Sequence, residues 1–92
     1  MNSEIRGHVL HLGGDITVKT ITAAAHSRFE QQCRLKDITV LDLSGVGRAD
    51  SACLSLLLAA LRLRPEGLAF QNLPEAVRAL AELYEINDWI KS

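Results

Sequence analysis

Ser51 is the side chain of this sequence that is best placed to do chemistry, and Asp50 and Cys53 lie beside it. These residues follow an aliphatic run and precede leucines at helical spacing, so they fall at the N-terminus of a helix. Unpaired backbone N–H groups and the positive end of the helix dipole favour an acceptor or a negative charge there. The Ser51 hydroxyl could contact a partner protein, cap the helix or carry a phosphate, and we rank these roles in that order.

Cys53 and the three histidines offer little further chemistry. A thiol near a helix N-terminus can have a lowered pKa, but a small packed side chain is the better interpretation of Cys53. His8 and His11 fall on opposite faces of a strand, so a shared metal site is not expected, and His26 is interpreted as a solvated or packed residue. No G-x-S-x-G motif surrounds Ser51, so a small hydrolase using Ser51 or Cys53 ranks last among the hypotheses. We therefore predict no catalytic residue, no metal and no cofactor.

The composition indicates one small domain that covers residues 1–92. Of the 92 residues, 48% are hydrophobic and only 4% are aromatic, so aliphatic side chains must form the core. The net charge is -1, with 10 basic and 11 acidic residues, and the scattered basic residues exclude a nucleic-acid-binding patch. Cys33 and Cys53 lack metal-site spacing, and neither a signal peptide nor a spanning segment is evident, which indicates a reducing, cytoplasmic setting.

Residues 38–43 form the clearest predicted strand, because a short aliphatic and β-branched run is bounded by turn-forming residues. A turn that contains Gly45 and Gly47 follows this strand. A helix then begins at Asp50 or Ser51, either of which can act as the N-cap, and extends to residue 63. Ser51 is therefore expected at the exit of a core strand. The apolar stripe of the helix consists of Leu54, Leu57, Leu58 and Leu61.

A strand and a helix are predicted before this central unit. Residues 8–12 alternate as a strand would and end at Gly13 and Gly14, which indicate a turn. Asp15 or Thr17 can cap the helix that follows. The apolar stripe of this helix consists of Val18, Ile21, Ala25 and Phe29.

A third strand and helix are predicted after the central unit, beyond a break in the chain at Pro65. Residues 68–70 form a short strand, Pro74 begins the last helix, and a terminal turn lays Trp89 on the domain. The alternation of strands and helices predicts an α/β fold with a small, mixed but mainly parallel sheet and right-handed crossovers. The buried stripe of the last helix consists of Val77, Leu80, Ala81 and Tyr84.

The stretch VLDLSGVGRADSACLSLLL, residues 40–58, resembles a STAS domain. The shared pattern is an aliphatic strand ending in Asp-Leu-Ser, a turn, and Asp-Ser-x-x-Leu at the start of a helix. Within this family, the turn, the leucine run and the Leu83-Tyr84 ending are most similar to the small single-domain STAS proteins of the Mla phospholipid-transport system. Members of the family commonly have glycine where Cys53 stands here. The N-terminus is short, so residues 1–6 allow only a brief edge strand and the family's first strand is expected to be reduced or absent.

The resemblance implies a non-catalytic protein that binds and regulates the cytoplasmic ATPase subunit of an ABC-type phospholipid transport system, which maintains outer-membrane lipid asymmetry. It also implies a cytoplasmic location, peripheral to the inner membrane through this partner, and a homodimer is possible when the partner is missing. The alternative is an anti-sigma factor antagonist whose Ser51 is phosphorylated by an anti-sigma kinase in a partner-switching pathway.

The helix that begins near Ser51 also indicates where a partner would bind, since small and apolar residues surround much of it. An apolar patch with a polar edge is typical of a protein-binding surface. A core role for Leu56 and Leu63 fits the sequence equally well, and the resemblance favours the docking surface. The predicted partner-binding residues are Ala52, Cys53 and Leu56 at the centre, and Arg48, Asp50 and Ser51 at the polar edge.

Overall fold

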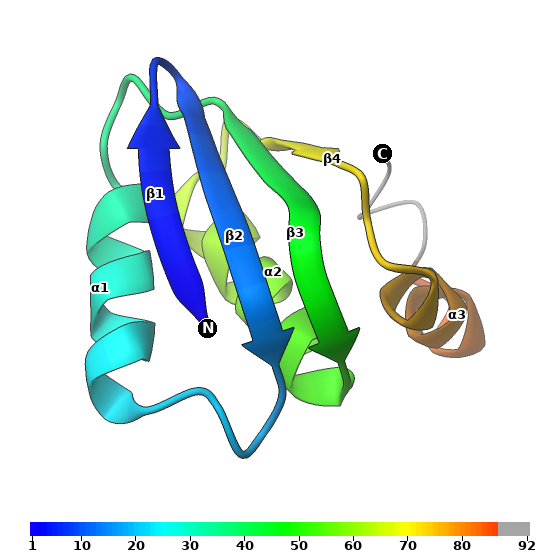
Figure 1. Ribbon diagram of the computed structural model, residues 1–92. Coiled ribbons are helices and arrows are strands. Elements are labelled where there is room, and N and C mark those ends of the chain that lie inside the picture. The colour runs from blue at the N-terminus through cyan, green and yellow to red at the C-terminus, as the bar shows by residue number, and fades with distance from the viewer. Residues whose placement is uncertain (87–92) are drawn as a thin grey trace.

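The computed structural model describes residues 1–86, which form a four-stranded mixed sheet with helices packed on it (Figure 1). The strands lie in the order β1-β2-β3-β4; β2 pairs with β3 and β3 with β4 in parallel, whereas β1 pairs with β2 in antiparallel fashion. The predicted α/β fold with a mainly parallel sheet is confirmed. The elements are β1 (Asn2–Arg6), β2 (Val9–Ile16), α1 (Ala23–Cys33), β3 (Val40–Ala49), α2 (Ser51–Leu63), β4 (Ala69–Gln71) and α3 (Glu75–Leu83).

The first strand is present, although the sequence led us to expect a reduced or absent one. β1 and β2 form a hairpin in which Arg6 pairs with Val9 across a two-residue turn. Gly7 has a φ of +60°, and glycine at the first central position is typical of the type II′ turn that suits twisted hairpins. The hairpin therefore depends on the turn at Gly7, which was overlooked at the sequence level because residues 1–6 are short and polar.

β2 and β3 extend further than predicted, to Ile16 and Ala49. Gly13 and Gly14 lie within β2, where they pair with Gly45 and Val46 of β3. A Cβ at Gly45 would lie 3.2 Å from the carbonyl oxygen of Leu12, and one at Gly13 would lie 2.7 Å from the side chain of Asn2. These glycines permit close approach between neighbouring strands, so the prediction of turns at these positions was wrong.

α1 begins at Ala23, later than predicted, because Thr22 caps it. The Thr22 hydroxyl accepts a hydrogen bond from the backbone N–H of Ala25 at 3.1 Å. The preceding residues form a separate turn in which the Thr20 hydroxyl accepts from the Thr17 N–H and donates to the Asp15 carbonyl. Val18 thus lies outside the helix and its stripe.

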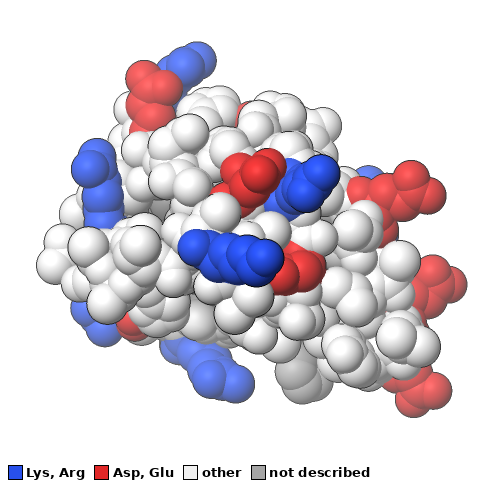
Figure 2. All heavy atoms as spheres, turned by 60° about the horizontal axis from the view of Figure 1, so that its bottom comes forward, with Lys and Arg blue, Asp and Glu red and all other residues white. Residues whose placement is uncertain are grey.

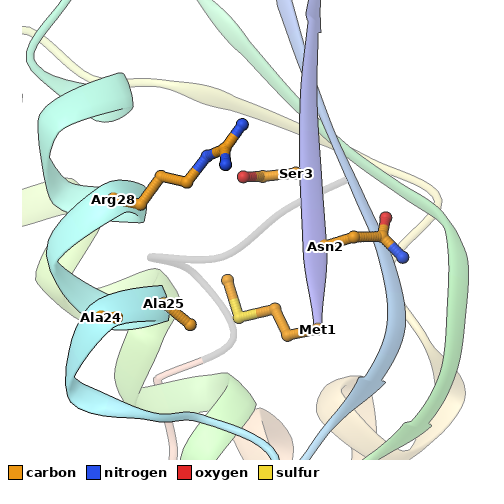
Figure 3. Close-up of a pocket in the computed structure, with 6 residues that line it drawn as sticks. All are labelled: Met1, Asn2, Ser3, Ala24, Ala25 and Arg28. Carbon is orange, nitrogen blue, oxygen red and sulfur yellow. The ribbon is translucent and has the colours of Figure 1, made fainter.

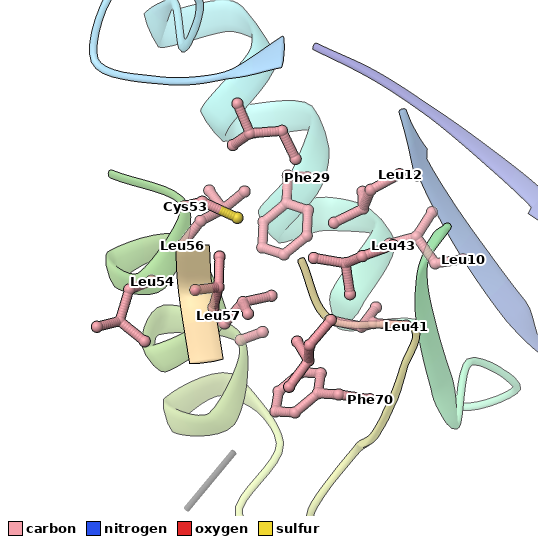
Figure 4. Close-up of a cluster of buried hydrophobic side chains, with 14 of the residues drawn as sticks. Leu10, Leu12, Phe29, Leu41, Leu43, Cys53, Leu54, Leu56, Leu57 and Phe70 are labelled. Carbon is pink, nitrogen blue, oxygen red and sulfur yellow. The ribbon is translucent and has the colours of Figure 1, made fainter. Parts of the chain in front are cut away.

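The core lies between the sheet and the helices (Figure 4). Helix α2 packs against both α1 and α3. Alternate residues of β2 and β3, such as Leu10 and Leu41, point toward Phe29 of α1 and Leu57 of α2. Leu54 and Leu57 of the predicted α2 stripe are buried, and Leu58 and Leu61 pack partly against the same cluster. Because α2 has neighbours on several sides, it buries more of its circumference than a surface helix does.

The last helix buries Val77 and Ala81, as predicted, and half-buries Leu80. Tyr84 is 56% exposed because α3 ends at Leu83, so its assignment to the buried stripe was wrong. The predicted packing of Trp89 lies outside the described residues. None of the helices within residues 1–86 is both long and apolar enough to cross a membrane.

Candidate functional site

Ser51 is the first residue of α2, two residues after the end of β3, and its side chain is exposed. Asp50, not Ser51, caps the helix: its Oδ1 accepts a hydrogen bond from the Ala52 N–H at 2.8 Å. Within residues 1–86 the Ser51 hydroxyl takes part in no side-chain hydrogen bond, so it is available to other molecules. Of the two candidate N-caps, the structure selects Asp50.

The carboxylates of Asp50 and Asp15 tie the start of α2 to the segment between β2 and α1. The Oδ2 of Asp50 accepts from the Val18 N–H at 3.2 Å, and the Oδ1 of Asp15 accepts from the Arg48 N–H at 2.9 Å. A Cβ at Gly47 would lie 2.8 Å from that same Asp15 oxygen. A side chain at position 47 would clash with Asp15, so Gly47 permits the hydrogen bond between Asp15 and the Arg48 N–H.

A shallow apolar hollow lies beside Ser51, between this segment and α2. Val18 at its rim is 74% exposed, so its apolar side chain extends the apolar surface of the hollow. The Nδ1 of His26 lies 2.8 Å from a carboxylate oxygen of Glu30 and is thereby held at the hollow. Figure 2 views the end of the sheet at which β3 ends and α2 begins. Acidic and basic side chains adjoin one another there within a mostly uncharged surface. The lining residues are Val18, Ile21, His26, Ala52, Ser55 and Leu56.

Two of the predicted partner-binding residues do not face solvent. Cys53 is fully buried and Leu56 is only 2% exposed, because both point into the core that α2 shares with the sheet and α1 (Figure 4). The expectation that they form the exposed centre of a docking surface was wrong for this reason. Arg48 and Ser51 are exposed, and Ala52 and Asp50 are half-buried, so these four remain accessible.

Burial also removes the reactivity that a helix N-terminus would give to Cys53. Desolvation raises the pKa of the Cys53 thiol to about 12, and the nearby Asp50 carboxylate acts in the same direction. The interpretation of Cys53 as a packed side chain is confirmed. Cys33, the last residue of α1, is likewise a buried thiol whose pKa is raised to about 12 by burial.

A polar network centred on Asp42 was missed at the sequence level. Asp42 is buried on the face of β3 opposite to Leu41 and Leu43, and its carboxylate accepts hydrogen bonds from the Ser44 hydroxyl at 2.8 Å and the Asn72 amide at 2.8 Å. The Nδ1 of His11 lies 2.9 Å from the same carboxylate. An aspartate between aliphatic residues of a core strand was the available signal, since such a group needs partners.

The hydrogen bonds of this network stabilise the ionised form of Asp42. Burial opposes ionisation, but the hydrogen bonds from Asn72, Ser44 and His11 outweigh it and lower the pKa of Asp42 from 3.8 to about 2. The Ser44 hydroxyl donates to the carboxylate and not to His11, so this network lacks the serine–histidine hydrogen bond of a catalytic triad. Within residues 1–86, no group of three potential ligands could hold a metal ion.

Comparison with known proteins decides the family. A family model described as "Mlab, STAS domain" matches residues 2–91. The chain belongs to the STAS domain family. Among solved structures, this STAS chain is similar to the unphosphorylated anti-sigma factor antagonist SpoIIAA, with a TM-score of 0.59 and 14% identity, over 99% of this chain and 86% of that one. No curated protein matches the chain.

The comparisons confirm the STAS resemblance and the fold that it implied. STAS domains act through contacts with other proteins, as binding or regulatory modules. The geometry around Ser51 is consistent with this role, because an exposed hydroxyl adjoins Ala52, which lines an apolar hollow.

Proposed function

We propose that this STAS protein binds and regulates the cytoplasmic ATPase subunit of an ABC-type phospholipid transport system that maintains outer-membrane lipid asymmetry. The family model that matches nearly the whole chain supports this pathway by its description. Such a protein would be cytoplasmic and would reach the inner membrane only through its partner. Its contribution would be to stabilise the transporter or to tune ATP hydrolysis, without catalysis of its own.

The observation that carries this proposal is the exposed apolar side chain of Val18 beside the unengaged hydroxyl of Ser51. An apolar side chain of the ATPase would fill the adjoining hollow, which Ala52 lines from α2. Arg48 and Ser51 would supply the polar rim. Cys53 lies beneath the surface, and Leu56 contributes only the small exposed part of its side chain to the lining of the hollow.

The test is co-purification of the tagged protein with the ATPase subunit, followed by titration calorimetry of the pair. Ser51→Asp places a charge at the rim of the surface, next to Asp50, and Val18→Asp places one at the hollow, so each should weaken binding at least tenfold. Ser27→Asp, on an exposed position of α1, is the matched control and should bind like wild type. Undiminished binding by both surface variants would contradict the proposal.

The second candidate function is that of an anti-sigma factor antagonist, and the free Ser51 hydroxyl is the observation that favours it. A phosphate there would add about two negative charges next to Asp50, which would disrupt an apolar contact. Mass spectrometry after incubation with an anti-sigma kinase and ATP distinguishes the two. A gain of one phosphate at Ser51, lost in Ser51→Ala, would favour the antagonist function over ATPase binding.

A further inference from the structure

β1 is an edge strand whose outer side is unpaired within residues 1–86. The two-residue turn makes Arg6 and Val9 a hydrogen-bonded pair, and such pairs alternate along an antiparallel ladder. The backbone groups of Arg6 and Glu4 are therefore directed toward β2. Those of Ser3 and Ile5 are directed outward, where another strand could accept and donate hydrogen bonds.

α1 runs alongside this free edge and turns it into a groove. The Ser3 hydroxyl donates to the side-chain oxygen of Gln32 at 2.6 Å, which holds the strand against the helix. Hollows open on both sides of this contact. One is lined by Met1, Asn2, Ser3, Ala24, Ala25 and Arg28, and the other by Ile5, Gly7, Leu35, Lys36, Asp37 and Ile38.

The two hollows differ in chemistry. In the first, the side chains of Met1 and Ser3 point toward α1 and Arg28 reaches toward Ser3 (Figure 3). No ion pair engages Arg28 among the described residues, so its guanidinium is available to a carboxylate. The second hollow has an apolar side formed by Ile5, which is 40% exposed, and Leu35, which is 49% exposed, and a charged side formed by Lys36 and Asp37.

We propose that this groove binds an extended peptide segment of a partner protein, which adds to β1 as a fifth, antiparallel strand. Alternate residues of the peptide would face α1, opposite Ile5, Ser3 and Met1. The hollow at Ile5 takes an apolar side chain, the position opposite Ser3 takes a carboxylate that pairs with Arg28, and the position opposite Met1 takes a second apolar side chain. The recognised pattern is apolar-x-acidic-x-apolar.

A second copy of the chain fits this groove less well than a peptide. Paired strands lie about 4.8 Å apart. Edge-to-edge pairing of two copies would therefore bring together the two α1 helices that flank β1, and packed helices need about 8–10 Å between their axes. A peptide without a flanking helix avoids this clash.

The groove shares no lining residue with the hollow beside Ser51. The proposal therefore goes beyond ATPase binding and stands or falls independently of it. Ser51→Asp should leave peptide binding in the groove unchanged, even where it abolishes binding of the ATPase.

The test is a two-dimensional NMR titration of the isotope-labelled full chain with acetyl-Thr-Leu-Thr-Glu-Thr-Val-Thr-amide. The NMR signals of β1, and of the side of α1 that carries Arg28, should change their chemical shifts as peptide is added. These changes should saturate as the peptide concentration approaches roughly the millimolar range. The peptide with lysine in place of glutamate should bind about two- to fivefold more weakly. Arg28→Glu should reverse this preference, whereas Arg62→Glu, an exposed change on α2, should not.

Three outcomes would overturn the proposal. These are the absence of shifts in β1, an equal affinity for the glutamate and lysine peptides, or shifts confined to α2 and the neighbourhood of Ser51. Because Arg28 is exposed, Arg28→Glu should fold normally, and the spectrum of the free variant verifies this before any peptide is added.

Discussion

The carboxylate of Asp50 accepts a hydrogen bond from the backbone N–H of Val18 while its other oxygen caps α2. One side chain therefore fixes both the start of a helix and a segment that is 32 residues earlier in the chain. The exposed position of Val18 and the free hydroxyl of Ser51 are held in one arrangement by this contact. The surface proposed for partner binding is thus organised before a partner arrives.

Asp50 and Ser51 should differ sharply in their effect on stability. Asp50→Ala removes the cap and should lower the free energy of unfolding by about 1–2 kcal/mol. Ser51→Ala removes no hydrogen bond within residues 1–86 and should change it by less than about 0.5 kcal/mol. Urea denaturation followed by circular dichroism measures both. An equal loss in the two variants would show that Ser51 caps the helix after all.

Arg64 should be the arginine that matters most for folding. Its buried guanidinium donates to the carbonyl oxygens of Cys33, Leu35 and Ile38 and also contacts Glu66, so it joins the end of α2 to the end of α1. Arg64→Ala leaves these carbonyls without their donor and should cost about 2–3 kcal/mol. Thermal melts compare it with Arg62→Ala, an exposed neighbour that should melt close to wild type.

The Asp42 network should make stability depend on acid pH. The pKa of Asp42 is about 2 in the folded state, against an ordinary 3.8, so its contribution is complete above the ordinary value. It is lost as the pH falls from about 4 to about 2, since the unfolded chain then binds the proton more readily. Urea midpoints across this range measure the effect. Asp42→Asn should be less stable near neutrality and should flatten this part of the profile; an unchanged slope would contradict the assignment.

Leu56 and Val18, which line the same hollow, should separate folding from binding. Leu56→Ala leaves a cavity in the core and should lower the free energy of unfolding by about 2–5 kcal/mol. Val18→Asp lies on an exposed segment and should leave stability within about 0.5 kcal/mol of wild type. Chemical denaturation of the two purified variants makes the comparison. If Leu56→Ala were as stable as wild type, Leu56 would not be the core residue described here.

The two thiols should be protected in the folded protein. Burial raises the pKa values of Cys33 and Cys53 to about 12, so almost no thiolate is present at neutral pH. A colorimetric disulfide reagent should react slowly with the native protein and fully after denaturation in guanidinium. Rapid reaction of one thiol in the native state would show that its part of the core opens readily.

The sequence was informative where periodic apolar residues determine the structure. The strand that contains Leu41 and the helix that contains Leu57 were predicted, because their burial follows simple spacing. The ends of the strands were not, because Gly13 and Gly45 indicate a turn in one context and close strand contact in another. Local pattern does not distinguish these cases, since the atoms that exclude a Cβ belong to other strands.

The candidate site was predictable in position but not in its exact surface. Asp50 and Ser51 were placed correctly at a helix start, whereas Leu56 was assigned to the exposed side of a helix whose neighbours were unknown. The Asp42 network joins residues that are 30 and 31 positions apart in the sequence. Such partners become visible only after the strand order and register are known.

The parallel pairing of β2 with β3 also constrains the order in which the chain can fold. The β1–β2 hairpin closes across two residues, and such hairpins form in about 1–10 μs. Pairing of Val9 with Val40 instead requires the chain to close a loop that contains all of α1. The conformational entropy of this loop is lost before the contacts that compensate for the loss can form. The crossover should therefore limit the folding rate, with Phe29, which packs α1 against the sheet, in the transition state.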